Sequence, residues 1–473
     1  MGGSFSSLST TLSALRYQRV AMDVAGGNVA NVGTEGYVRR SAVGQAQGAS
    51  DVPAMWSRSQ SAGNGVSSGA VERLVDPFLD ARARLEHGNR SSLQTRSAAL
   101  ARVENTLGEP GDAGVAAALT AFQQGWADVA NNPADGAARS QLLGRATTLA
   151  VALGSQSRSV TTEWADQRSR LDAAVTEANG LAVDLARINE SIGVAEVTGT
   201  DAGLLLDKRD QMTMRLAELV GATSTLDSAG VLKVEVGGAV LVEGKRAGSI
   251  QVRGDAAYTP TAPGSLVLTV TDPAGVAQDV TSTVKTGSVG GQLELLTGTL
   301  PGYLSTLDTF TADMAARVNT LHAGGFDLQD PAQPGRDIFV SSNGNPITAA
   351  TIRVAPLDAD QVAASSYVTA TGGPTLDGSH ADLLATADLG GGDYRRLVTT
   401  FGAEVASARR IAESQGVLTG QVDAAREAIS GINIDEEMVN LLAAQRAYEG
   451  AARVMTAIDS MLDTLINRTG LTR

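Results

Sequence analysis

Cysteine is absent from this chain of 473 residues, and aromatic residues make up only 4% of it. The missing thiols exclude a disulfide framework, a thiolate zinc site and a cysteine nucleophile. Three histidines are present, His87, His322 and His380, and none has a second histidine one helical turn away. We therefore expect three ordinary surface or boundary residues there rather than ligands of a metal ion.

Long apolar runs and an excess of positive charge are also missing. No run of about eighteen apolar residues occurs, so we expect no membrane insertion. The first ten residues, MGGSFSSLST, lack the basic and apolar regions of a cleaved secretory signal. The formal net charge of -14 offers no basic stripe to a nucleic acid, so nucleic acid is not an expected partner.

Apolar residues recur at heptad spacing near both ends of the chain, which places them along one face of a helix. The N-terminal row consists of Phe5, Leu8, Leu12, Leu15, Met22 and Val29. The C-terminal row consists of Ile434, Leu441, Tyr448, Met455, Ile458, Leu462 and Leu465. Two such rows predict terminal helices that pair as a coiled coil. Asn433 is expected to cap the second helix, and Glu436 to complete a capping box.

Between the ends, helical stripes alternate with segments of period two, such as residues 232–236, which predict strands. These patterns predict a mainly α fold with inserted β domains: an elongated, multidomain chain with paired terminal helices, a central helical bundle and an outer β-rich domain. The expected parts are 1–35 with 431–473 for the terminal coiled coil; 36–221 with 291–326 and 393–430 for the helical bundle; 222–290 for the outer β-rich domain; and 327–392 for an irregular, strand-leaning insertion.

Three motifs were candidates for chemistry. The glycine run 389–394, LGGGDY, lacks the strand and lysine of a phosphate loop, so a flexible linker is expected. The motif 207–211, DKRDQ, puts four charges on a helix with an apolar opposite face, which is typical of a solvated or salt-bridging surface. The acidic residues 435–437 fit a helix N-terminus better than a metal site or an acid–base pair. We expect no catalytic residue, no metal, no cofactor and hence no enzyme.

Residues 26–40, GGNVANVGTEGYVRR, follow the N-terminal apolar row. A phosphate loop would need a preceding strand and a lysine at the next helix start, and the sequence has neither. The segment instead predicts a joint between the terminal helix and the next domain. The glycines would allow positive φ, the asparagines would cap or turn the chain, and the tyrosine and arginine would anchor the exit. The expected joint residues are Asn28, Asn31, Gly33, Gly36, Tyr37 and Arg39.

The joint segment resembles the N-terminal signature of the bacterial flagellar axial proteins, the family of rod, hook and junction subunits. That signature reads Asn-Asn-Ile-Ala-Asn-x-x-Thr-Pro-Gly-Tyr, followed by a small residue and Arg. The matching residues are Asn28, Ala30, Asn31, Thr34, Gly36, Tyr37 and Arg39, whereas Gly27 and Glu35 stand in place of asparagine and proline. Residues 435–468 resemble the C-terminal signature of the family. A further resemblance is to the hook–filament junction subunit that adjoins the hook. It extends over residues 109–139, 184–192, 204–222 and 290–296.

This resemblance implies a structural subunit at the hook–filament junction, extracellular in the flagellum, and exported unfolded by the flagellar type III system without a cleaved signal peptide. It implies contacts with further copies of the chain in a helical homo-oligomer, with the hook protein and with the second junction protein. A flagellar export chaperone is a further implied partner. The terminal helices are expected to order on assembly, because short isolated helices are marginal in water.

Three alternatives remain open at this point. A hook or distal-rod protein is the alternative within the family, although those proteins lack the helical insertion of residues 186–222. A secreted coiled-coil adhesin or translocator tip comes from another class, as does an enzyme with a site in the β-rich part. Terminal truncations and deletion of residues 222–290 separate these functions, because only the axial role depends on the terminal helices.

Overall fold

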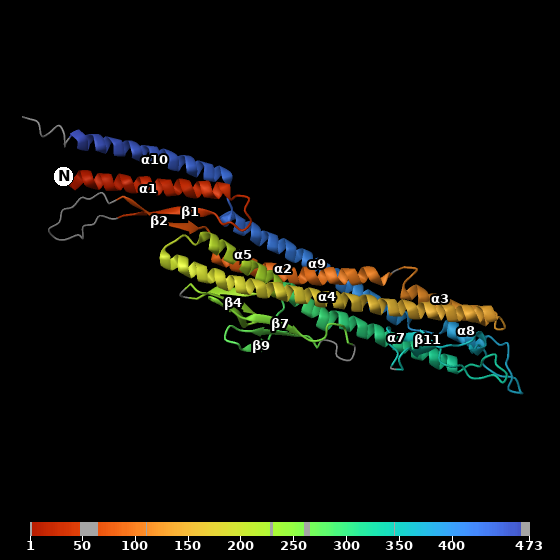
Figure 1. The fold of residues 1–473 in the computed structure, drawn as a ribbon. Helices are drawn as coiled ribbons and strands as arrows, with labels where there is room; N and C mark the ends of the chain where they lie inside the picture. Colours follow the sequence, from red (N-terminus) through yellow and green to blue (C-terminus); the bar gives the residue numbers. More distant parts are fainter. Residues whose placement is uncertain are drawn as a thin grey trace, which may run out of the picture.

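The computed structural model describes residues 2–47, 65–109, 111–227, 230–259, 265–344 and 346–464. Over these ranges the protein is elongated and mostly helical, with small antiparallel sheets (Figure 1). At one end, α1 (Gly2–Ala30) and α10 (Ile434–Asp463) lie side by side and antiparallel. Asn433 caps α10 by accepting hydrogen bonds from the Asp435 and Glu436 amides. The mostly helical content and the contact between the terminal helices confirm the expected fold class.

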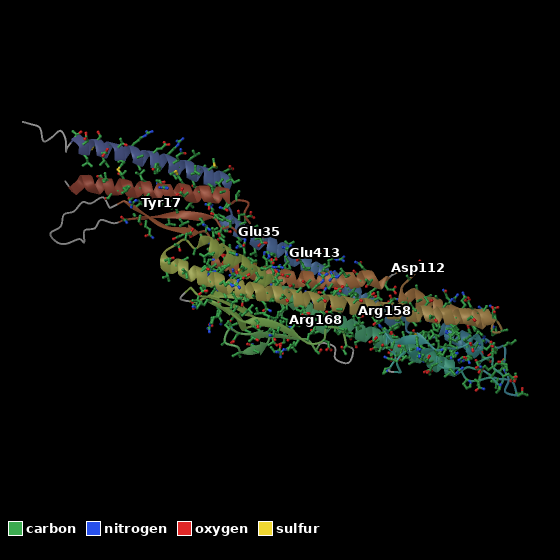
Figure 2. All side chains as sticks on the ribbon, viewed as in Figure 1. Tyr17, Glu35, Asp112, Arg158, Arg168 and Glu413 are labelled. Atoms are coloured by element: carbon green, nitrogen blue, oxygen red, sulfur yellow. The ribbon has the colours of Figure 1, made fainter. Side chains whose placement is uncertain are left out.

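An antiparallel hairpin, which the sequence pattern assigns to the helical bundle, lies against α1. Its strands are β1 (Arg40–Ala46) and β2 (Val66–Arg73). The Tyr17 hydroxyl donates to the Ala42 carbonyl at 3.2 Å, and the Val66 amide donates to Ser13 Oγ at 3.2 Å (Figure 2 labels Tyr17). Serine, glycine and glutamine interrupt the alternation of apolar and polar residues in these strands, so period two is weak.

The helical bundle is organised around α4 (Gly136–Thr198), which at 1.5 Å per residue is roughly 95 Å long. Asp135 caps its first turn, and Gly199, with a φ of 67°, ends it. The other helices are α2 (Pro77–Leu107), α3 (Val115–Asn131), α5 (Gly203–Val220), α6 (Gly287–Glu294), α7 (Leu300–Ala323) and α9 (Gly391–Ser430), with the π-helical turn η1 (Leu295–Thr299) between α6 and α7. The sequence pattern starts the helix at 291, whereas α6 begins four residues earlier, and its Gly291 packs directly on the α2 backbone at Ser92.

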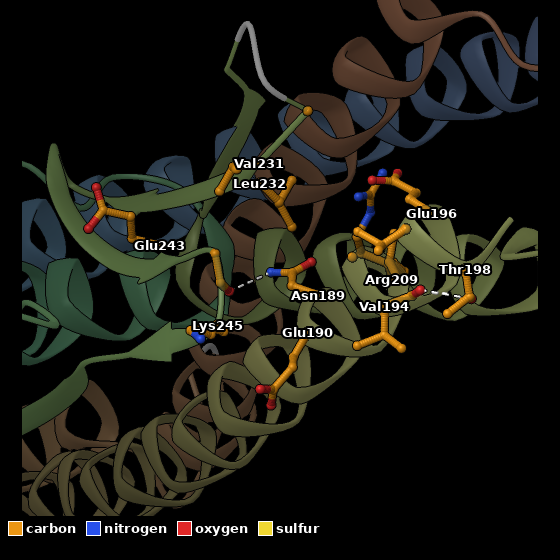
Figure 3. A pocket seen from close by; sticks show the side chains of 15 residues that line it. Asn189, Glu190, Val194, Glu196, Thr198, Arg209, Val231, Leu232, Glu243 and Lys245 are labelled. Atoms are coloured by element: carbon orange, nitrogen blue, oxygen red, sulfur yellow. Dashed lines mark hydrogen bonds between the residues drawn. The ribbon is translucent and has the colours of Figure 1, made fainter.

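The outer β-rich part consists of two small antiparallel sheets beside α4. The first sheet contains β3 (Thr223–Leu226), β4 (Leu232–Val236), β5 (Ala239–Glu243) and β6 (Arg246–Ala247); the second contains β7 (Ser249–Arg253), β8 (Val267–Thr271) and β9 (Ala277–Asp279). The α4 residue Asn189 donates to the Gly244 carbonyl at 2.9 Å (Figure 3). A groove of about 580 Å³ lies between the end of α4, α5 and this sheet.

The two chain segments that join this β-rich part to the bundle cross at a pair of glycines. Gly221 and Gly287 both have a positive φ, at 64° and 74°. A Cβ atom on Gly287 would lie 2.4 Å from the Gly221 amide nitrogen, which is closer than any side chain permits. The entry and exit of the β-rich part therefore form one narrow neck.

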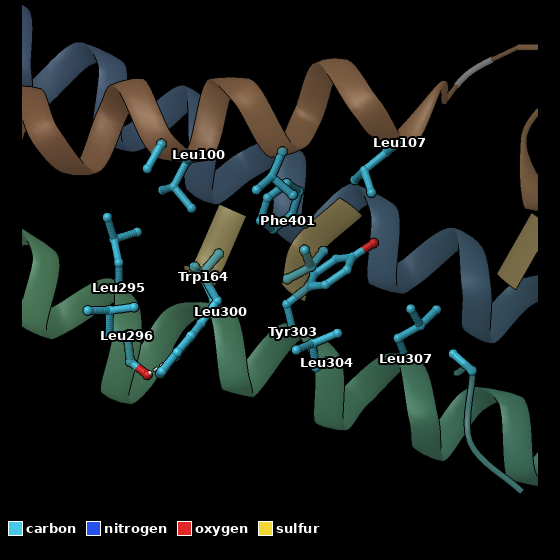
Figure 4. Close-up of a cluster of buried hydrophobic side chains, with 14 of the residues drawn as sticks. Leu100, Leu107, Trp164, Leu295, Leu296, Leu300, Tyr303, Leu304, Leu307 and Phe401 are labelled. Carbon is cyan, nitrogen blue, oxygen red and sulfur yellow. Dashed lines mark hydrogen bonds between the residues drawn. The ribbon is translucent and has the colours of Figure 1, made fainter. Parts of the chain in front are cut away.

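A continuous apolar core fills the bundle, and Figure 4 shows the part between α2, α4, α7 and α9. Trp164 Nε1 donates to the Leu296 carbonyl of the π-helical turn at 3.0 Å. The rings of Tyr303 and Phe401 lie 4.8 Å apart. Long helices that each carry one apolar stripe bury those stripes against one another, so the bundle completes its own core.

The insertion beyond α7 contains more helix than the strand-leaning pattern of 327–392 predicts. Its elements are β10 (Phe339–Ser341), β11 (Ile352–Val354), the 3-10 turn η2 (Ala359–Gln361) and α8 (Ser379–Thr386). His322 is fully buried here, and His380 is 8% exposed. The expectation of three surface or boundary histidines is therefore wrong for His322 and His380, because both are buried where the insertion packs on α7.

Candidate assembly joint

The segment between α1 and β1 meets the bundle where Figure 2 labels Glu35. The Gln211 side chain of α5 donates to the Glu35 carbonyl at 2.5 Å. Gly36 adopts a φ of 75°, and a Cβ atom there would meet the Gln211 side chain. Gly33 does not adopt positive φ, so among these two glycines only Gly36 matches the expectation. The turn places the chain directly on α5.

Asn28 is the fully buried centre of the joint. Its Oδ1 accepts hydrogen bonds from the Tyr37 hydroxyl at 3.2 Å and the Arg40 amide at 3.1 Å. Its Nδ2 donates to the Arg40 carbonyl at 2.8 Å and to Glu437 Oε2 at 3.0 Å. One side chain thus uses all four of its hydrogen-bonding positions and connects α1, β1 and α10.

Glu437 is 3% exposed and connects α10 to the same joint. Its Oε1 accepts from Arg39 Nε at 2.8 Å, while Arg39 Nη1 lies 3.0 Å from Glu436 Oε2. Glu436, which the capping pattern turns back toward Asn433, therefore pairs with Arg39 instead. A buried carboxylate needs such charged and hydrogen-bonding partners, since it is otherwise costly to desolvate.

A second ion-pair network joins the hairpin to α5. Arg40 Nη2 lies 3.1 Å from Asp207 Oδ2, and Arg73 bonds Asp207 Oδ1 at 2.8 Å and Asp210 at 2.7 Å. The Arg40 guanidinium also lies 5.0 Å from the centre of the Tyr37 ring. Burial raises the pKa of Tyr37, with Arg40 opposing the shift, so the hydroxyl stays protonated and donates. The network holds the hairpin against the bundle.

His87 of α2 lies between two further helices below the joint. Its Nε2 lies 2.9 Å from Asp423 of α9, and its Nδ1 lies 3.3 Å from Glu218 of α5. The hydrogen bond to Glu218 raises the pKa of His87, burial opposes the shift, and Asp423 adds to it. The ring therefore ties α2, α5 and α9 together.

Of the expected joint residues, the structure brings Asn28, Tyr37 and Arg39 together. Asn31 bonds locally instead, to the Gly27 carbonyl and to Thr34. The residues that the sequence pattern missed are Arg40, Arg73, Asp207, Asp210 and Glu437. Two signals pointed to part of this set: the paired arginines at 39 and 40, and the DKRDQ motif, whose first and fourth residues form the ion pairs.

The N-terminal apolar row is only half covered. Leu8, Leu15, Met22 and Val29 are of intermediate exposure, whereas Leu12 is 38% exposed. The side chain of Phe5 lies outside the described atoms. The buried residues of α1 are instead Thr11, Ala25 and Asn28, which are small or polar. Small residues let the neighbouring helix and hairpin approach closely.

The C-terminal row is covered still less. Leu441, Met455, Ile458 and Leu462 are of intermediate exposure, while Ile434 and Tyr448 are 48% and 37% exposed. Leu465 lies outside the described residues. Within α10 only Glu437 and Ala444 are buried. A single neighbouring helix therefore leaves much of the apolar surface of α10 in contact with water.

No group of three or more His, Cys, Asp or Glu side chains in the described ranges is arranged to hold a metal ion. Of the helices described here, none is both long enough and apolar enough to cross a membrane. The fold and the joint together are those of an elongated structural subunit whose N- and C-terminal helices pair.

The comparisons with known proteins agree with this class. The profile described as the flagellar hook-associated protein FlgK helical domain matches residues 100–339, slightly more than half of the chain. The profile of the flagellar basal body rod FlgEFG protein C-terminal region matches residues 426–468. The chain belongs to the family of the flagellar hook-associated protein FlgK, a family of flagellar structural proteins and not of enzymes. The resemblance found in the sequence is thereby confirmed.

Relatives match along nearly their whole length. The chain is 27% identical to flagellar hook-associated protein 1 of Bacillus subtilis (strain 168), over 100% of the chain and 99% of the relative. It is 24% identical to the protein of that name from Escherichia coli (strain K12), over 97% and 99%. The solved structure of the flagellar hook junction protein FlgK from Burkholderia pseudomallei shares the fold, with a TM-score of 0.64 at 17% identity, over 74% of this chain and 100% of that one.

Proposed function

We propose that this chain is the structural subunit that joins hook and filament, and that it polymerises through its terminal helices. Polymerisation would present a surface on which the second junction protein and the filament assemble. The names of the relatives support the location, since they are hook-associated or hook junction proteins. The expected division into terminal coiled coil, helical bundle and outer β-rich domain forms part of this proposal.

The observation that carries the proposal is a second apolar row on α10. Met438 and Leu442, four residues apart, are 46% and 48% exposed, and Val439 beside them is 64% exposed. None of these three residues belongs to the heptad row of α10 that begins at Ile434. A helix with apolar residues on more than one side needs more than one neighbour.

A second copy of this chain is the neighbour that we propose. The exposed apolar residues of α10 in one copy would pack against a different surface of the helix pair in the next copy. Such unlike contacts generate helical assemblies. The hook protein and the second junction protein would contact the two ends of the helical assembly. A flagellar export chaperone and the type III export apparatus are the partners proposed for the chain before assembly, which would place the finished protein outside the cell.

The test replaces the exposed row while sparing the helix pair. A Met438→Asp, Leu442→Asp variant, produced in a strain that lacks the native chain, is expected to leave hooks without filaments. The matched control is Ile411→Asp on α9, an apolar residue that is likewise 50% exposed but lies on the bundle. The measurement is electron microscopy of hooks together with motility. Normal filaments on hooks of the double variant would rule the proposal out.

A further inference from the structure

The apolar rows of α1 and α10 do not by themselves fix how far one helix is displaced along the other. Leu8, Leu15, Met22 and Val29 repeat every seven residues, and so do Leu441, Tyr448, Met455 and Leu462. A displacement by one heptad, roughly 10 Å, brings like residues opposite like residues again. Something other than the apolar pattern must select one register.

Asn28 and Glu437 form the contact that breaks this repetition. They are 0% and 3% exposed, and Asn28 Nδ2 donates to Glu437 Oε2 at 3.0 Å. Counting seven residues away from each brings Ala21 opposite Ala444, and these alanines line the same groove of about 420 Å³. After a shift by one heptad, Glu437 would face Ala21, which offers no hydrogen-bond donor.

The connecting segments tie this contact to the rest of the molecule. Asn28 also binds the amide and carbonyl of Arg40, which closes the segment 31–39 into a loop. The Arg39 amide donates to the Ser430 carbonyl at 3.1 Å, next to the start of α10. The hydrogen-bonded centre therefore fixes the helix pair relative to both chain segments that lead into the bundle.

We propose that Asn28 and Glu437 are positioning residues that set the register of α1 along α10. Buried polar pairs are known to fix the register of coiled coils at some cost in stability. This inference deepens the proposed function, because the register decides which residues of α10 remain exposed for a neighbouring copy. It concerns the free chain, however, so its test can fail or succeed independently of assembly.

The test uses engineered cysteines, which report cleanly because the chain has no cysteine of its own. One full-length chain carries Ala21→Cys and Ala444→Cys, which match the observed register. A second carries Ala14→Cys and Ala444→Cys, which match a register shifted by one heptad. Disulfide formation in oxidised glutathione is followed on non-reducing gels. We expect the matched pair to form at least about tenfold faster, because the shifted register leaves a buried carboxylate unpaired.

Glu437→Leu is expected to reduce this ratio to about two or less, because the apolar side chain fits either register. The matched control is Glu436→Leu, which removes the neighbouring carboxylate from the same Arg39 but alters a side chain that is 58% exposed. It should keep the parental ratio. Glu437→Gln retains an oxygen for Asn28 Nδ2 and should also keep it. Far-UV circular dichroism verifies that each variant is folded.

Several outcomes would overturn the inference. Equal rates for the two cysteine pairs in the parental chain would show that no register is selected. An unchanged ratio in Glu437→Leu, or an equal loss in Glu436→Leu, would show that the buried contact has no specific role. Loss of both cross-links in Glu437→Leu, with the bundle still folded, would assign Glu437 to helix pairing in general instead of to register.

Discussion

The helical bundle and the terminal helix pair differ in how many of their residues the chain itself buries. The central helix α4 buries 25 of its 63 residues, whereas α10 buries two of its 30. The bundle buries its apolar stripes within one chain, and Trp164 and Leu171 lie inside a continuous core. The terminal pair instead leaves an apolar row in water. The difference agrees with the proposal that the bundle folds completely within one chain, whereas the terminal pair is completed by neighbouring copies.

The largest expected effect comes from breaking the terminal pair. Leu441→Asp puts a charge into the apolar heptad row of α10, the helix that packs against α1. We expect filament attachment to be abolished, as judged by motility and electron microscopy. The bundle should unfold at an unchanged temperature in differential scanning calorimetry, because it does not depend on this contact. Wild-type motility of Leu441→Asp would contradict the division between the two regions.

The converse substitution breaks the bundle. Leu171 is fully buried in α4, so Leu171→Ala should lower the free energy of unfolding by about 3 kcal/mol through lost apolar contacts and a cavity. Chemical denaturation followed by circular dichroism measures the loss. Leu12→Ala, at a residue 38% exposed, is the control and should cost less than about 1 kcal/mol. Equal losses would mean that the helix pair is as complete as the bundle.

Acid should weaken the far end of the bundle. Burial lowers the pKa of His322 to about 4, and nearby His380 and Arg139 add to the shift. The Nδ1–H donates to the Arg336 carbonyl while Nε2 accepts from the Ala363 amide, and this second contact needs the neutral ring. In the unfolded chain the His322 ring binds its proton near pH 6.5. The free energy of unfolding is therefore highest above that pH and falls by about 3 kcal/mol toward pH 4. Urea titrations across this range measure the slope.

His322→Gln is the variant that removes this pH dependence, and a slope that persists in it would refute the assignment. His87 has the opposite sign, because its folded pKa is raised above the unfolded value. The stability that it contributes is complete below the unfolded pKa and is lost as the pH rises through the folded pKa. His87→Gln should therefore weaken the protein more in mild acid than in alkaline solution.

Within the terminal pair, hydrogen exchange should show a gradient. Amides of residues 24–30 and 437–444 lie near the polar centre of the joint, and we expect them to exchange more slowly than amides of residues 7–15 and 452–462 in the dilute chain. Mass spectrometry after pepsin digestion resolves the two sets. Uniform protection along both helices would contradict the expectation that these helices become fully ordered only on assembly.

The smallest expected effect concerns the turn. Gly36→Ala should cost about 1 kcal/mol, because alanine is strained at a φ of 75°, whereas Gly33→Ala should be nearly neutral. Thermal unfolding of the two single variants makes the comparison. An equal effect at both positions would show that backbone conformation at Gly36 does not matter.

Helical stripes predicted the long helices well, because a sustained apolar period is a strong local signal, as in α4. The joint was harder to predict. Asn28, Tyr37 and Arg39 were identified through a motif. Glu437 was interpreted only as an acidic residue of a helix N-terminus, because its contact with Asn28 spans most of the chain. Arg73 and Asp207 meet across more than a hundred residues for the same reason. The β1–β2 hairpin and the buried ring of His322 depend on tertiary packing that no short window contains.

The glycine neck at Gly221 and Gly287 has a consequence for how such chains can be altered. Because the β-rich part leaves the bundle and returns to it at neighbouring glycines, closing this loop places little constraint on its length. A module of another size can therefore replace this part, provided that it also covers the α4 surface that carries Asn189. For the same reason, a foreign domain with adjacent termini can be grafted there as cargo on a polymer.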